Sequence, residues 1–293
     1  MDKKIIFWGI ISIFYILLAL SLYANFGYPN GTNDFVFHYF KANHEYNDIL
    51  VNDGYSLDTF YNYPSLYHEL VFFTPDPFLF WLVGFAIIFV GIPFMLYKIS
   101  GTKYVIPVYF CLVNFPHFAI FASVYPSALV IFLALIYFYK RKFWVWGLLF
   151  IPACLLHRSG LELFIIILVA ELLSRFLKEK CFMAVVLSGT GFNLRELYNL
   201  LTVYLPVFVI LPALKKMSEK REYFYLIIFF VSLLAMQSDI RTYNVAQMVA
   251  VIFSAQYFKT FKYKKLFWFT CGFFLFINLL FYVPSIVLSV IFI

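Results

Sequence analysis

The order of apolar and polar residues divides the chain into long apolar runs joined by short polar connections. The runs do not alternate every second residue, as the strands of a membrane barrel do, and most are long enough for a helix that satisfies its own backbone hydrogen bonds in lipid. The pattern predicts helical segments at 5–24, 78–97, 104–124, 126–139, 143–156, 160–174, 181–190, 197–214, 223–236, 243–258 and 266–288. Because the run at 181–190 is too short to cross a bilayer alone, we expect about 9–11 spans. The expected fold is an all-α, polytopic transmembrane helical bundle.

Composition excludes an ordinary soluble domain. Hydrophobic residues make up 64% of the 293 residues and charged residues only 13%, whereas charged residues account for about a quarter of a soluble globular protein. We therefore expect a single transmembrane domain over 1–293, located in the cell membrane and in contact with the lipid bilayer. No cofactor-binding motif is present, and the four cysteines lie in apolar runs without a CxxC pair, which favours packing over disulfides or metal binding.

Positive charge follows a regular pattern along the chain. All but four of the 22 Lys and Arg residues fall in every second connection, as in the turn at 140–142. Short loops rich in Lys and Arg stay on the cytoplasmic side, so the N-terminus is expected to be cytoplasmic and the long polar connection at about 25–77 extracytoplasmic. The net charge of +7 is therefore explained by the basic residues of the predicted cytoplasmic loops. These residues form no basic stripe on a soluble domain, and we expect no nucleic-acid partner.

The predicted outer face collects most of the other ionisable residues. It receives the four remaining cations, all five histidines and several acids: Lys41, Arg158, Arg195, Arg241, His38, His44, His68, His117, His157, Asp34, Glu69, Glu162, Glu196 and Asp239. Several neighbouring spans are short, which predicts that these side chains dip into a cavity lined by protein and water. Ionisable groups at that depth cost about 2.5–3.5 kcal/mol each on insertion scales, so they are functional candidates.

Two stretches of the first outer connection stand out. In NDFVFHYFKANHEYND, Asp34 and His38 are four residues apart and would share a face of a helix. Asp34 could simply cap an interfacial helix, or the pair could contribute to a metal site, although no third ligand follows at a defined spacing. In FYNYPSLYHELVFF, Pro64 is expected to begin a new helix, with His68 and Glu69 one turn further on.

These stretches resemble the first extracytoplasmic loop of GT-C superfamily membrane glycosyltransferases. The matching residues are Asp34, Phe35, His38, Ala42, Tyr61, Tyr63, Pro64, Leu66 and His68. The resemblance implies a multi-span enzyme that transfers a sugar from a polyprenyl-phosphate-linked donor to a glycan or lipid-linked acceptor outside the cytoplasm. It implies that Asp34 is the catalytic carboxylate. It also makes His38, Tyr63, His68 and Glu69 candidates for binding donor or acceptor.

A lipid phosphate that leaves during transfer needs cations to stabilise it. Arg241, with Asp239 nearby to orient it, is the first candidate, followed by Arg195 and by Arg158 with His157 beside it. Each arginine could instead be a snorkelling or interface-anchoring cation. The need for a divalent cation stays open.

Two other functions fit parts of the sequence. The run from Tyr125 to Leu168 contains two short spans, a basic turn and an H-x-S-G/A motif, and is similar to exopolysaccharide polymerases, which act on polyprenyl-pyrophosphate-linked repeats. That function would depend on His157, Arg158 and Arg241 more than on Asp34. A non-enzymatic transporter or lipid flippase would require repeated halves and a midplane site, and no convincing repeat is present.

Overall fold

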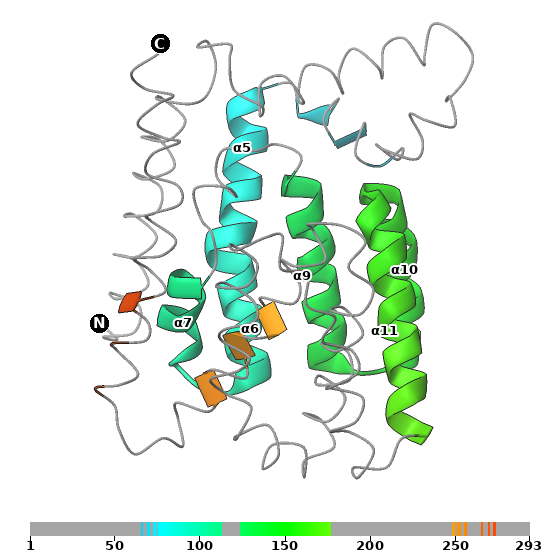
Figure 1. Cartoon of the computed structure of the whole chain (residues 1–293). Coiled ribbons are helices and arrows are strands. Elements are labelled where there is room, and N and C mark those ends of the chain that lie inside the picture. The colour runs from blue at the N-terminus through cyan, green and yellow to red at the C-terminus, as the bar shows by residue number, and fades with distance from the viewer. Residues whose placement is uncertain are drawn as a thin grey trace, which may run out of the picture. The chain divides into compact units, whose positions relative to one another are not determined.

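The computed structural model describes residues 76–112 and 124–176 as continuous segments (Figure 1). It also describes Leu66, Glu69, Leu70, Phe73, Thr74, Met248, Val249, Val251, Ile252, Ala255, Gln256, Lys265, Phe269, Gly272 and Phe273. Within these residues the chain is helical, with short turns and no strand. The all-α prediction is confirmed for this part of the chain.

A long helix begins directly after Asp76 and contains three segments: α5 (Pro77–Ala86), η1 (Ile87–Gly91) and α6 (Ile92–Ser100). The Asp76 carboxylate accepts a hydrogen bond of 2.8 Å from the backbone N–H of Phe78, and proline occupies the first turn, where its missing N–H costs nothing. These features explain why the helix begins here.

The stretch Phe78–Ser100, 23 residues long, is the one helix in the described part of the chain that is long and apolar enough to cross a membrane. At about 1.5 Å per residue it extends about 34 Å, compared with a hydrocarbon core of about 30 Å. Two shorter apolar helices follow, Pro126–Lys140 and Phe143–Leu156. Length and composition alone do not separate a membrane span from a buried core helix, so the surface of these helices matters as well.

The middle segment of this helix, η1, is a π-helix. Its last residue, Gly91, faces the ring of Phe132 on α9 (Val124–Lys140), where an added Cβ would lie 3.2 Å from the ring edge. Both α5 and η1 pack against α9, and Ile88 and Phe89 of η1 are buried. A short run of wider helix therefore coincides with a close helix–helix contact.

Helices α9 and α10 (Phe143–Leu156) form a tightly connected, packed pair. Only Arg141 and Lys142 lie between them, and Arg141 has a positive φ of 43°. The backbone N–H of Arg141 donates to the Tyr137 carbonyl at 2.6 Å, which closes the end of α9. Helix α11 (Arg158–Phe176) then begins after the single residue His157.

The chain divides into two compact units, Met1–Met95 with Phe115–Leu161, and Leu96–Asn114 with Glu162–Ile293. In the second unit, Gly101 ends α6 with a φ of 62°, and α7 (Val105–Leu112) follows. The Gln256 side chain donates a hydrogen bond to the carbonyl of Ser100. A residue 156 positions away in sequence therefore satisfies a backbone acceptor at the end of α6.

Three of these helices carry an apolar stripe on their exposed face. The stripes comprise Leu79, Val83, Val90 and Phe94 on α5–η1–α6; Trp144, Leu148 and Ile151 on α10; and Leu161, Ile165, Val169 and Leu172 on α11. The opposite faces are buried, for example at Val145 and Ala153 of α10. A surface helix of a soluble protein normally exposes a polar face, so these helices are apolar on both sides.

Candidate functional site

The described part of the candidate site is the α10–α11 corner, which we define as His157, Arg158, Ser159 and Gly160. His157 is in an extended conformation, with φ −165° and ψ 147°, so it separates α10 from α11. Its backbone remains bonded to both helices. Its N–H donates to the Ala153 carbonyl at 3.4 Å, and its carbonyl accepts from the Gly160 N–H at 2.8 Å. The corner is therefore a defined turn.

The His157 side chain caps the start of α11. Its Nδ1 accepts a hydrogen bond of 3.0 Å from the backbone N–H of Ser159, the second residue of the helix, and lies 2.8 Å from the Ser159 hydroxyl. A backbone N–H can only donate, so Nδ1 must present its lone pair, and the neutral ring carries its proton on Nε2. The imidazole takes the position that Ser, Asp or Asn usually fills at a helix N-terminus.

Gly160 allows the two helices to meet closely. A Cβ at this position would overlap the backbone carbonyl of Ala153 in α10, so any side chain larger than hydrogen would push the helices apart. By contrast, a Cβ at Gly147, also on α10, would have no atom within 4 Å. The HRSG sequence therefore contains one glycine that the geometry requires.

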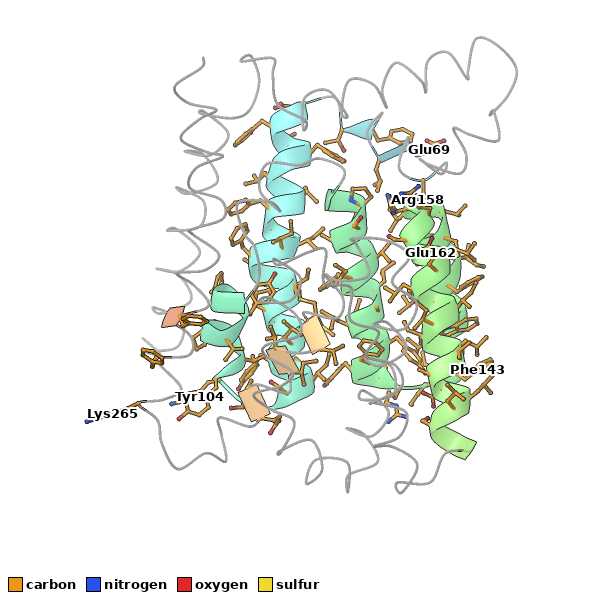
Figure 2. All side chains as sticks on the ribbon, in the orientation of Figure 1. Glu69, Tyr104, Phe143, Arg158, Glu162 and Lys265 are labelled. Atoms are coloured by element: carbon orange, nitrogen blue, oxygen red, sulfur yellow. The ribbon has the colours of Figure 1, made fainter. Side chains whose placement is uncertain are left out.

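Arg158 is the first residue of α11, and its side chain is partly exposed. A cation here lies at the positive end of the helix dipole, an arrangement that costs about 0.3–1 kcal/mol unless a nearby anion compensates. Glu162 follows four residues later on the same helix. In Figure 2 Arg158 and Glu69 are both drawn toward the end of the first unit where α10 passes into α11.

The structure describes three of the predicted site residues. Glu69 is helical and partly exposed, as are its described neighbours Leu66 and Leu70, and the adjacent residues His157 and Arg158 both lie at the corner. The other candidates lie outside the described residues: Asp34, His38, Tyr63, His68, Arg195, Asp239 and Arg241. Their roles stay predictions, as does substrate binding by Glu69, His157 and Arg158.

Sequence reasoning did not assign a role to Ser159 or Gly160. The available signal was a polar residue and a glycine placed between two apolar runs directly after a histidine, a pattern typical of a turn with a helix start. Across the described residues, no group of three His, Cys, Asp or Glu side chains could hold a metal ion. Cys154, on α10, is a free thiol and is partly exposed.

No protein-family model, curated protein or solved structure matches the chain. What can be inferred about function therefore comes from the composition, the pattern of predicted spans and the geometry of the α10–α11 corner.

Proposed function

We propose that this chain is a polytopic glycosyltransferase of the cell membrane. It transfers a sugar from a polyprenyl-phosphate-linked donor to a glycan or lipid-linked acceptor, on the extracytoplasmic side. The proposal combines the GT-C-like residues of the first predicted outer loop with the predicted location of most other ionisable residues on the outer face.

Multi-pass membrane insertion is supported by the surfaces of the described helices. The exposed stripes on α5–η1–α6, α10 and α11 consist of large apolar side chains, such as Val83, Leu148 and Ile165. Exposed apolar area of this extent is unfavourable in water and favourable against lipid acyl chains. In a polytopic protein, these faces contact the bilayer while the buried faces form the bundle core.

The observation that carries the proposed chemistry is the location of Arg158. An arginine at the first position of a helix places its guanidinium beside the positive end of the helix dipole, and the two together form a favourable environment for phosphate. The guanidinium fork can donate two parallel hydrogen bonds to phosphate oxygens. We assign Arg158 to the donor phosphate, together with Arg241 and Arg195.

The proposed reaction assigns Asp34 as the general base. Its carboxylate would take the proton of the acceptor hydroxyl as that oxygen attacks the anomeric carbon, while the bond from this carbon to the lipid phosphate breaks. The electron pair of that bond leaves with the phosphate oxygen, where the arginines stabilise the charge. His38, Tyr63, His68 and Glu69 would orient the two substrates.

The α10–α11 corner also favours a second candidate function. The H-x-S-G motif has a definite structural role in the corner, and this motif underlies the similarity to exopolysaccharide polymerases. Such an enzyme would use a polyprenyl-pyrophosphate-linked repeat and would depend on His157, Arg158 and Arg241. The two functions share the lipid-linked substrate and differ in the number of phosphates and in the need for Asp34.

Transfer of radiolabelled sugar by membranes that contain the wild type or a single variant, at matched expression, tests the proposal. We expect Asp34→Asn to lose at least about 100-fold of the transfer from polyprenyl-monophosphate sugars. Arg158→Ala should lose about 10- to 100-fold, since it removes charge-assisted hydrogen bonds. Lys140→Ala, on the predicted cytoplasmic side, is the control and should transfer normally.

The alternatives give different results in the same assay. Full activity of Asp34→Asn together with loss in Arg158→Ala, seen with pyrophosphate-linked repeats, would identify the polymerase. Absence of transfer by the wild type from every donor would reject both enzymes and favour a transporter.

A further inference from the structure

We propose that the His157 ring, the backbone N–H of Ser159 and Gly160, which lacks a side chain, together fix the first turn of α11 so that Arg158 meets the donor phosphate. His157 then acts through Nδ1 and the backbone and does not itself bind the substrate. This inference rests on the proposed role of Arg158 at the lipid phosphate, and it assigns functions to Ser159 and Gly160 that the sequence did not suggest.

Burial separates Arg158 from the other residues of the corner. The exposed fraction is 1% for His157 and 6% for Ser159, and Gly160 is also buried. Arg158 alone is partly exposed. The α10–α11 corner therefore buries three of its members, and Arg158 is the one member that stays partly exposed.

The hydrogen bonds of the corner determine how firmly Arg158 is held. The first turn of a helix has N–H groups without partners inside the helix, and it frays unless a cap satisfies them. Here Nδ1 of His157 satisfies the N–H of Ser159, and the His157 carbonyl accepts from the N–H of Gly160. Because these bonds fix the backbone of Ser159 and Gly160, they also fix the direction of the Cα–Cβ bond of Arg158.

Close helix contact supplies the second restraint. Because Gly160 has no side chain, the first turn of α11 lies directly against the Ala153 carbonyl of α10. The same carbonyl accepts the N–H of His157. The residue before Arg158 and the second residue after it therefore both contact the Ala153 carbonyl of α10. A shift of α11 along α10 would break both contacts.

The two nitrogens of His157 allow the positioning role to be separated from ligand binding. The asparagine side chain is short and places its amide oxygen near the position of Nδ1, so His157→Asn can keep the cap. The glutamine side chain reaches one bond further and places its amide near the position of Nε2, so His157→Gln keeps a polar group there and loses the cap. A positioning residue tolerates Asn, whereas a residue that binds the substrate through Nε2 tolerates Gln.

The experiment uses the purified full-length chain in detergent and two independent measurements. The first is the Kd for polyprenyl monophosphate and for polyprenyl pyrophosphate, measured by native mass spectrometry. The second is hydrogen–deuterium exchange of peptides that contain Ser159, which reports the cap without any substrate. The variants are His157→Asn, His157→Gln, Ser159→Ala, which keeps the backbone N–H, and Arg158→Ala as the reference.

For His157→Gln we expect about tenfold faster exchange at Ser159 and a weaker Kd, approaching that of Arg158→Ala. His157→Asn and Ser159→Ala should stay within about threefold of the wild type in both measurements. In the Arg158→Ala background, His157→Gln should weaken binding no further, because a positioning residue acts only through the residue that it positions.

Other outcomes would overturn the inference in distinguishable ways. Normal exchange in His157→Gln would show that Nδ1 does not cap α11. Altered exchange together with tighter lipid binding by His157→Gln than by His157→Asn would show that His157 binds the lipid phosphate directly. A wild type that binds neither lipid, with the exchange pattern as expected, would confirm the cap and reject the proposed function, and the positioning role would fall with it.

Discussion

At the scale of single residues, the two turns that carry an αL residue show how the chain uses backbone conformation. Gly101 and Arg141 each follow the last residue of a helix, with φ values of 62° and 43°. Each donates its N–H to a carbonyl four residues earlier, that of Tyr97 or Tyr137. Glycine adopts this conformation freely, whereas a side chain costs about 1 kcal/mol or more. Compared with glycine, arginine at position 141 therefore adds a positive charge to the turn and lowers the free energy of unfolding.

Replacing Arg141 with glycine is expected to stabilise the folded protein by about 0.5–1 kcal/mol, because the strained φ is relieved. Thermal unfolding in detergent should show a Tm higher by about 2 °C. The matched change is Gly101→Ala, where a Cβ would meet no atom within 4 Å, so the whole effect would come from placing a side chain at a positive φ. It should lower stability by about 1 kcal/mol. A lower Tm in Arg141→Gly would instead show that the guanidinium contributes more than the strain costs.

At the scale of helices, the positions of the described helices along the chain were well predicted, and no prediction was made about the contacts between them. The apolar run at 143–156 coincides with α10 (Phe143–Leu156), and the run at 160–174 lies inside α11 (Arg158–Phe176). The run at 78–97 lies inside the long helix Phe78–Ser100. Of the run at 104–124, the structure describes the first part, and α7 (Val105–Leu112) confirms it as a helix.

The join of α10 and α11 allows a sharp test of close helix packing. Gly160→Ala should destabilise the protein by about 3 kcal/mol or more, because the new Cβ meets the backbone of Ala153, which cannot rotate away. Gly147→Ala, on the same pair of helices, meets nothing and should be neutral or stabilising by up to about 1 kcal/mol. Chemical denaturation of both variants measures the difference. Equal stability of the two would contradict the close approach.

At the scale of the whole molecule, the distribution of charge and of apolar surface predicts how the chain crosses the membrane. The exposed turn residue Lys142 belongs to the basic, predicted cytoplasmic side, whereas Thr74 precedes the long helix on the predicted outer side. Lys142 makes no side-chain hydrogen bond as the cap of α10, so replacing it removes no cap. These two positions are therefore suitable reporters of topology.

Single cysteines at these positions, in a chain whose four native cysteines are replaced by alanine, should label differently with a membrane-impermeant maleimide. Thr74→Cys should react in intact cells, and Lys142→Cys only after the membrane is permeabilised. Protein abundance and total labelling in detergent serve as controls. Labelling of both positions from the outside would reject the predicted orientation, and with it the extracytoplasmic site.

For the candidate site, the sequence selected the residues, and their functional roles stay predictions. His157 and Arg158 were selected because ionisable residues next to short apolar runs are costly, and the structure places them at a helix start. Sequence could not show that Nδ1 of His157 accepts the Ser159 N–H, because the spacing of residues does not specify which ring nitrogen faces the backbone. The roles of Asp34, Arg195 and Arg241 stay predictions.

The sequence by itself determined the helical nature of the described segments, their approximate ends and the separation of basic from other ionisable residues. These are local properties: a run of apolar residues long enough for a helix, a capping Asp76 before Pro77, and charges in short connections. The tertiary structure alone decided the π-helical segment beside Phe132, the hydrogen bond of Gln256 to the end of α6 and the close contact of Gly160 with Ala153. These depend on atoms that only folding brings within a few ångströms of one another, so no local pattern of residues encodes them.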